Sequence, residues 1–318
     1  MIKHQLFLLT ICCLMAACSN APTEEANRAT NPAVISLRGD TLLPPKDSEA
    51  ALAKKDSLLK VAVANYETDP DNLDHIIWLG RRTAYLWRYH EAIGIFTEGL
   101  KKHPNSPELY RHRGHRYLSI RQVDKAIADF EKAGALAAGR GLEIEPDGIP
   151  NQLNTPLSNL HFNIYYHLGL AHYAKGDFRN AKAAYKSCMD WSVNPDLKVA
   201  TADWLYMTYR RLGETEQADS LLATIPADWE LIENDGYFNR ILLYKGLKKP
   251  EELLDFSETE LDNQLNLVTQ GYGVGNWYLY NGDTTLAFEI FNKILETDYW
   301  SAFGYLAAEA EVAGRTGQ

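Results

Sequence analysis

The sequence predicts an all-helical fold in which pairs of antiparallel helices stack into a superhelix. One observation is a period of 34 residues, because repeats of about 20 to 50 residues are typical of solenoid proteins. A second is a set of glycines at the expected ends of first helices, where the chain must turn in a left-handed conformation. A third is the presence of capping residues followed by proline and an acid at expected helix starts, as in Ser106-Pro107-Glu108 and Asn194-Pro195-Asp196.

The composition supports a folded chain and excludes one class of partner. Of the 318 residues, 46% are hydrophobic, enough to fill a substantial core. The formal net charge is -10 and the isoelectric point is near 5.4. Since no basic field covers the chain, attraction to a phosphate backbone is not expected, and nucleic acid is not a predicted partner.

Residues 1–17 have the properties of a lipoprotein signal peptide. Lys3 precedes an apolar stretch from Leu6 to Ala17 that is too short to cross a bilayer but suits a secretory signal. The stretch ends in Leu14-Met15-Ala16-Ala17-Cys18, which resembles a lipobox, so Cys18 is the predicted lipidation site. The mature protein would then be held on a membrane. Ser19 favours the bacterial outer membrane, with a periplasmic and a surface-facing position both open.

The segment 18–46 is expected to be a flexible tether, and the solenoid is expected to occupy 47–318. Pro22, Pro32, Pro44 and Pro45 lie in the tether among small and polar residues. The first element after it is a predicted helix over 48–66.

Two repeat units follow that helix. Four residue types recur 34 residues apart: Pro70 and Pro104, Gly80 and Gly114, Ala92 and Ala126, and Phe96 and Phe130. Small residues allow two helices to approach closely, and the aromatic residues fill the wider gap to the next unit. The spacing predicts two consecutive helix pairs.

Further units follow; the third and the last match the repeat pattern closely, and the fourth matches it less well. The third contains Tyr165, Gly169, Ala181 and Tyr185, the fourth Leu205, Tyr209, Ala218 and Leu222, and the last Gly275, Tyr278, Ala287 and Phe291. The turn glycines of these three units are Gly176, Gly213 and Gly282. A degenerate pair is expected at 237–246 and 251–256, and a capping helix at 300–313. The prediction is about five to six helix pairs plus a cap.

This spacing resembles the tetratricopeptide-repeat pattern, and the resemblance covers most of residues 50–313. The segment 269–277 and the insertion described next also resemble an uncharacterised bacterial tetratricopeptide family. The resemblance implies that the first helix of each unit lines a concave groove that binds a protein or peptide. Carried over by repeat position, the implied groove residues are Arg81, Tyr85, Arg111, His115, Asn163, Tyr166, Tyr173, Asp203, Met207, Arg210, Arg211, Tyr272, Asn276 and Tyr280.

An insertion at 134–159 interrupts the period before the third unit. It is rich in helix breakers and contains Glu143, Glu145 and Asp147. Because it begins and ends beside the groove, and because long structureless connections are uncommon in compact domains, we expect an ordered flap that folds over the groove and adds carboxylates to it.

The expected function is that of a scaffold, with two alternatives. The first alternative is a glycan-capturing accessory lipoprotein of an outer-membrane transport system, with Tyr272, Trp277 and Tyr280 as aromatic platforms. The second is a hydrolase that uses the acidic insertion, but no nucleophile and base are recognisable. We therefore expect no enzyme, no cofactor and no metal, although His112, His115, His161, His167 and His172 could be imagined as metal ligands.

Overall fold

The computed structural model describes residues 32–254 and 261–316. The predicted signal peptide 1–17, Cys18 and the tether up to residue 31 lie outside the described residues. Over these residues the fold is helical, as predicted, and a two-stranded hairpin near the N-terminus is an addition that was not predicted.

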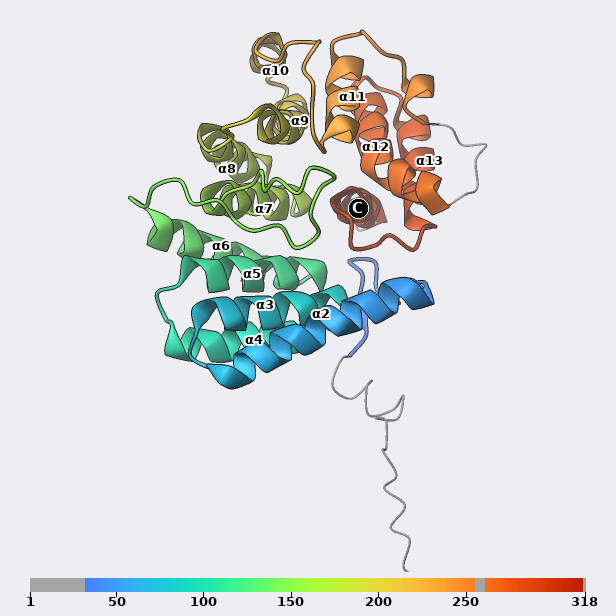
Figure 1. Ribbon diagram of the computed structural model, residues 1–318. Coiled ribbons are helices and arrows are strands. Elements are labelled where there is room, and N and C mark those ends of the chain that lie inside the picture. The colour runs from blue at the N-terminus through green and yellow to red at the C-terminus, as the bar shows by residue number, and fades with distance from the viewer. Residues whose placement is uncertain (1–31, 255–260, 317–318) are drawn as a thin grey trace, which may run out of the picture.

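Antiparallel helix pairs follow one another along the described chain (Figure 1). A long N-terminal helix α2 (Glu49–Thr68) precedes the pairs α3 (Leu73–Tyr85) and α4 (Tyr89–Lys102), α5 (Pro107–Ser119) and α6 (Val123–Ala137), α7 (Leu160–Ala174) and α8 (Phe178–Asp190), and α9 (Pro195–Arg211) and α10 (Thr215–Ala223). Next come α11 (Asp235–Tyr244) and the 3₁₀ helix η1 (Pro250–Glu252), then the pair α12 (Leu261–Tyr280) and α13 (Thr284–Leu295), and finally α14 (Phe303–Thr316).

Helix starts are capped where the sequence predicts it. The side chain of Ser106 accepts a hydrogen bond from the backbone N–H of Leu109, and that of Asn194 accepts one from Leu197. In both helices a proline occupies the first turn, where a backbone N–H would have no hydrogen-bond partner within the helix. These caps fix the starts of α5 and α9.

Close helix contacts explain the period. A Cβ atom added at Gly80 would lie 2.3 Å from the ring of Phe96, and one added at Gly169 would lie 2.6 Å from the ring of Tyr185. The same contact joins Gly114 to Phe130 and Gly275 to Phe291. Each glycine therefore admits the aromatic ring of the second helix in its own pair, and the predicted repeat register is confirmed.

Two elements differ from the prediction. Val34–Ile35 and Thr41–Leu42 form the antiparallel strands β1 and β2, so part of the predicted tether is folded. The hairpin is stable because Val34 and Leu42 are buried in the main core. In the degenerate unit, α11 forms as expected, but the described part of its partner is only the short η1, and Phe256 lies outside the described residues.

The superhelix closes on its own C-terminal helix. The helix α14 packs on α13 and α12 as a cap, as predicted, but it also packs on α7 from the far side of the arc. Figure 1 shows the end of α14, marked C, between the lower half of the arc and α12 and α13. The concave face, where the resemblance implies a ligand groove, is therefore occupied by the chain itself.

Candidate functional site

The insertion is an ordered flap across the first helices of three units. Arg111 of α5 pairs with Glu145 at 2.9 Å, and the Nη1 of Arg82 in α3 donates to the carbonyl of Gly148 at 3.0 Å. Asn163 of α7 donates to Glu145 as well. The flap is closed on itself by a backbone bridge between Ile144 and Asn159. It covers the groove and contributes carboxylates, as expected.

The acidic residues of the flap are engaged in structural contacts. Arg140 pairs with Glu143 at 2.5 Å and with Glu108 of α5 at 2.6 Å. Glu145 is held by Arg111, and burial raises the pKa of Asp147 above its usual value. Two of the three carboxylates are thus neutralised by arginines, which removes the main support for a hydrolase built on the insertion.

Four predicted groove residues do line a common cavity. Arg81 and Tyr85 of α3 face Arg111 and His115 of α5 around a space of about 130 Å³. The flap lies beside this space, because a Cβ atom added at Gly148 would lie 1.6 Å from the Tyr85 hydroxyl and 2.8 Å from Nη2 of Arg81. Ala84, Phe96, His112 and Arg116 complete the lining. We call this space the flap cavity.

The histidines at this site are neutral side chains packed among rings. Burial, and secondarily the charge of the arginines, lowers the pKa of His112 and His115 well below the usual value. Burial lowers the pKa of His167 to about 3. The rings of His115 and His167 lie 4.3 Å apart, and Phe303 of α14 packs on both. In the described part of the chain no three His, Cys, Asp or Glu residues are placed to hold a metal ion.

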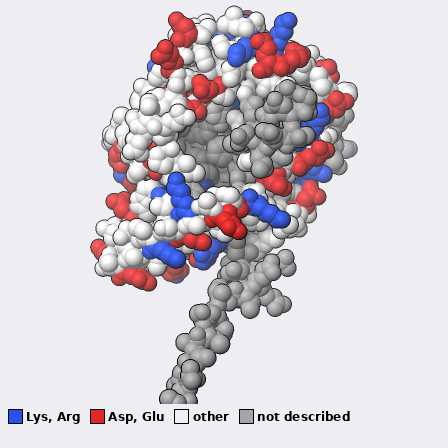
Figure 2. Space-filling view, turned by 45° about the vertical axis from the view of Figure 1, so that its right-hand side comes forward, with Lys and Arg blue, Asp and Glu red and all other residues white. Residues whose placement is uncertain are grey.

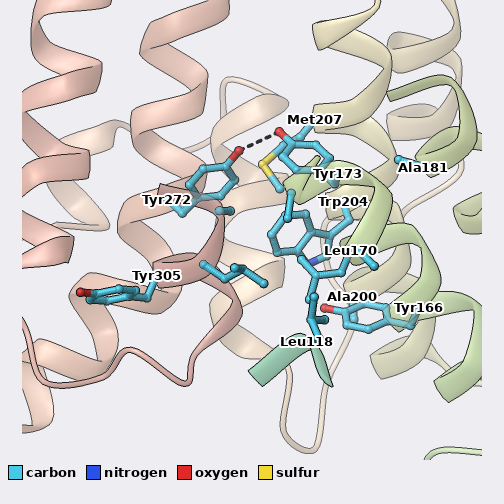
Figure 3. Packing of buried hydrophobic residues seen from close by; sticks show 14 of the residues in the cluster. Leu118, Tyr166, Leu170, Tyr173, Ala181, Ala200, Trp204, Met207, Tyr272 and Tyr305 are labelled. Carbon is cyan, nitrogen blue, oxygen red and sulfur yellow. Dashed lines mark hydrogen bonds between the residues drawn. The ribbon is translucent and has the colours of Figure 1, made fainter. Parts of the chain in front are cut away.

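The predicted groove residues of the later repeats are buried inside the closed superhelix. Tyr272 of α12 donates to the Tyr173 hydroxyl of α7 at 2.9 Å, as Figure 3 shows beside Trp204 and Met207. Asn276 donates to the same Tyr173 oxygen at 3.1 Å. Asn163 and Tyr166 are buried as well. These residues are not available to a ligand at the surface, because α12 and α14 pack where an open groove would lie.

Asp203, another predicted groove residue, forms a buried ion pair instead. It binds Arg240 of α11 and accepts a hydrogen bond from Tyr244 at 3.0 Å, and both Asp203 and Arg240 are almost fully buried. Burial raises the pKa of Asp203 to about 6, while the arginine and the tyrosine oppose that rise. The pair joins α9 to α11.

The last three predicted residues lie at the edge of the fold. Arg210 stacks on Tyr280, with its guanidinium carbon 4.2 Å from the ring centroid. Arg211 pairs with Glu311 of α14 and borders an open cleft of about 700 Å³. Of the aromatic platforms that would support glycan capture, Tyr272 is fully buried. Trp277 and Tyr280 are partly exposed, so the glycan alternative loses one of its three platforms.

The contacts that close the superhelix on α14 were not predicted from the sequence. Arg121, at the turn between α5 and α6, pairs with Glu309 of α14 at 2.7 Å, and donates to the Trp300 carbonyl at 2.8 Å. The backbone N–H of Leu37 in the hairpin donates to Glu309 too, and the indole of Trp300 donates to the Leu43 carbonyl at 2.6 Å. The N-terminal hairpin, the second unit and the C-terminal helix therefore meet at one buried carboxylate.

The sequence does contain one indication of this junction, at the turns between the helices of the first two units. The turn position that holds Gly176, Gly213 and Gly282 in later units is occupied by Trp87 and Arg121 in the first two, with φ of 63° and 64°. A left-handed conformation is unfavourable for such side chains. Both side chains are used at the junction, where the rings of Trp87 and Trp300 lie 5.2 Å apart.

The outer side of the flap exposes aliphatic side chains. Ile149 is 81% exposed and Leu153 is 65% exposed, and Leu142 and Ile144 are each half exposed. Acidic and basic residues are interspersed over the described surface in Figure 2. None of the described helices is long and apolar enough to cross a bilayer.

Comparison with known proteins supports the repeat assignment. A family model described as tetratricopeptide repeat matches residues 162–192, which span α7 and α8. Small glutamine-rich tetratricopeptide repeat-containing protein 2 of Saccharomyces cerevisiae is 29% identical over 102 residues, or 32% of this chain and 23% of that protein. The Hsp70-Hsp90 organizing protein of Triticum aestivum is 31% identical over 118 residues, or 36% of this chain and 16% of that protein. The matches thus span less than a quarter of either relative.

Among solved structures, a tetratricopeptide repeat protein from Parabacteroides merdae superposes with a TM-score of 0.45 at 15% identity, covering 82% of this chain and 94% of that one. The match of the tetratricopeptide-repeat family model to residues 162–192 confirms the predicted resemblance. This fold supports a role as a scaffold for protein or peptide interaction, and such proteins are generally not catalysts.

Proposed function

We propose that this chain, a solenoid of the tetratricopeptide-repeat type, is a membrane-anchored scaffold that holds a protein partner in the bacterial cell envelope. Lipid on Cys18 would fix its location, and the segment before the hairpin would give it reach. The partner would bind the outer side of the flap. The exposed aliphatic side chains of the flap are the observation that carries this proposal.

The partner is placed on the flap because other parts of the chain already cover the concave face. The flap and α14 pack on the first helices of several units, so an extended peptide could lie along these helices only by displacing part of the chain. The flap itself is anchored at Arg111 and Arg82 and presents Ile149 and Leu153 outward. Clustered apolar side chains on a soluble surface mark interaction sites. An anchored loop also loses less freedom on binding than a mobile one.

The anchor is tested by Cys18→Ala. We expect this variant to move from the membrane fraction to the soluble fraction while its helical circular dichroism stays unchanged, because only the lipid attachment is lost. Fractionation of cells and immunoblotting measure the result. A mutant that still pellets with outer membranes would refute the lipoprotein assignment, whatever the flap does.

The flap surface is tested by a photo-crosslinking amino acid placed in living cells at Ile149 or Leu153. A matched control position is Leu247, an aliphatic residue that is 60% exposed outside the flap. We expect the two flap positions to yield the same dominant crosslinked envelope protein, and Leu247 not to yield it.

The double variant Ile149→Ser with Leu153→Ser should then bind that identified protein at least about tenfold more weakly, since burying one such side chain contributes about 1.5 to 3 kcal/mol. Binding is measured with the two purified proteins, and Leu247→Ser is the control. Identical crosslinks from all three positions, or undiminished binding by the double variant, would contradict the proposal.

A further inference from the structure

The flap cavity holds an excess of positive charge. Three arginines, Arg81, Arg111 and Arg116, line a space of about 130 Å³. Only Arg111 has a carboxylate partner, Glu145 at 2.9 Å. In the described part of the chain neither Arg81 nor Arg116 forms an ion pair; the first lies over the ring of Trp78 and the second over the ring of Tyr89. Two guanidinium groups therefore line the cavity without a carboxylate at ion-pair distance. Arg81 does interact electrostatically with Asp147 of the flap, because the arginine charge opposes the rise in the pKa of that carboxylate.

The cavity also contains unused hydrogen-bond donors. The Nε atom of Arg111 is buried and has no hydrogen-bond partner. Arg111 donates through Nη1 to the Nδ1 atom of His112 at 2.9 Å, so that ring is a neutral acceptor there and adds no charge. An unpaired buried donor is unfavourable unless a ligand satisfies it. Planar guanidinium groups match the paired oxygens of an oxyanion.

We propose that the flap cavity binds a small tetrahedral oxyanion, such as inorganic phosphate or sulfate, between Arg81, Arg111 and Arg116. This inference goes beyond the scaffold function and does not depend on the partner. The anion would supply an ion-pair partner to Arg81 and Arg116 and would accept a hydrogen bond from the unpaired Nε–H of Arg111.

The size of the cavity limits the ligand. A volume of about 130 Å³ is well below the roughly 300 Å³ at which pockets for larger molecules begin. The backbone of Gly148 lies against Tyr85 and Arg81, two of the lining residues. A free anion fits this volume, whereas the rest of a larger phosphorylated molecule would have to lie outside the cavity, against the flap.

Binding of the anion would also hold the flap. The flap is tied to α3 and α5, the helices that supply the arginines, by the contacts of Arg82 with Gly148 and of Arg111 with Glu145. Relief of the repulsion among the arginines should favour the closed flap. We therefore expect the flap backbone to exchange hydrogen more slowly when phosphate is bound.

The test is isothermal titration calorimetry of the full mature chain with sodium phosphate at fixed ionic strength, beside sodium chloride and phosphoserine. Fixed ionic strength removes general screening. We expect saturable phosphate binding, no binding of chloride and weaker binding of phosphoserine. Phosphoserine binding as tight as phosphate would overturn the assignment to a free anion.

Two variants and one control test whether phosphate binds in the flap cavity. Arg116→Gln should weaken phosphate binding at least about tenfold, and Glu145→Gln should strengthen it because the competing carboxylate is gone. Arg179→Gln, at an exposed arginine on α8, should leave binding unchanged. Circular dichroism checks folding, and Glu145→Gln decides the matter if Arg116→Gln unfolds. Absence of phosphate binding, or equal binding by all variants, would overturn the proposal.

Discussion

Replacing Glu309 with glutamine is expected to lower the free energy of unfolding by about 3 to 5 kcal/mol, as for other buried ion pairs that lose one partner. The Glu309 carboxylate is fully buried and faces the Arg121 guanidinium, which is also buried. Glutamine keeps the shape but leaves the arginine charge without compensation in a place that water does not reach. Urea unfolding followed by circular dichroism measures the change.

The control for this variant is Glu289→Gln on α13, where the side chain is exposed. A surface change of this kind should alter the free energy of unfolding by no more than about 0.5 kcal/mol. If Glu309→Gln behaves like Glu289→Gln, the hairpin, the second unit and α14 do not meet around a buried carboxylate in solution.

The second large effect is an acid-dependent loss of stability caused by His167. The pKa of this ring is about 3 in the folded chain and near the ordinary 6.5 in the unfolded chain. Between these values the unfolded chain binds the proton and the folded chain does not. The contribution of His167 is therefore complete above pH 6.5 and decreases as pH falls toward 3, by about 1.4 kcal/mol per pH unit.

The variant His167→Phe isolates this term, because phenylalanine fills the ring site between Phe130 and Phe303 without titrating. At neutral pH the wild type should be the more stable protein, since His167 donates to the Asn163 carbonyl at 2.5 Å. Between pH 6.5 and 4.5 the difference in unfolding free energy should move by about 3 kcal/mol in favour of the variant. A difference that stays constant with pH would show that His167 is not buried as a neutral ring.

The repeats and their caps could be predicted because the signals are local. Gly80 and Phe96 lie in adjacent helices of one unit, and a cap such as Ser106 acts within one turn. Such short-range patterns can be recognised in a single sequence. The positions of the helices and of the flap could therefore be predicted before the structure was known.

The closure of the superhelix could not be predicted in the same way. Arg121 and Glu309 are separated by 188 residues, and no periodic pattern connects them. The repeat positions that imply an open groove assume that the concave face is empty. Instead, α12 and α14 pack on Tyr173 and Tyr272, and Arg240 and Tyr244 of α11 bury Asp203. The available hint was the presence of Trp87 and Arg121 at turn positions that favour glycine.

Hydrogen exchange of the α14 backbone amides tests whether the chain occupies its own concave face. We expect the amides of Leu306 to Glu309, which are buried between α12, α13 and α7, to exchange only through global unfolding, as slowly as those of the α7 core. Exchange of these amides orders of magnitude faster than in α7 would show that α14 leaves the concave face, so that the groove and not the flap would be the surface open to a partner.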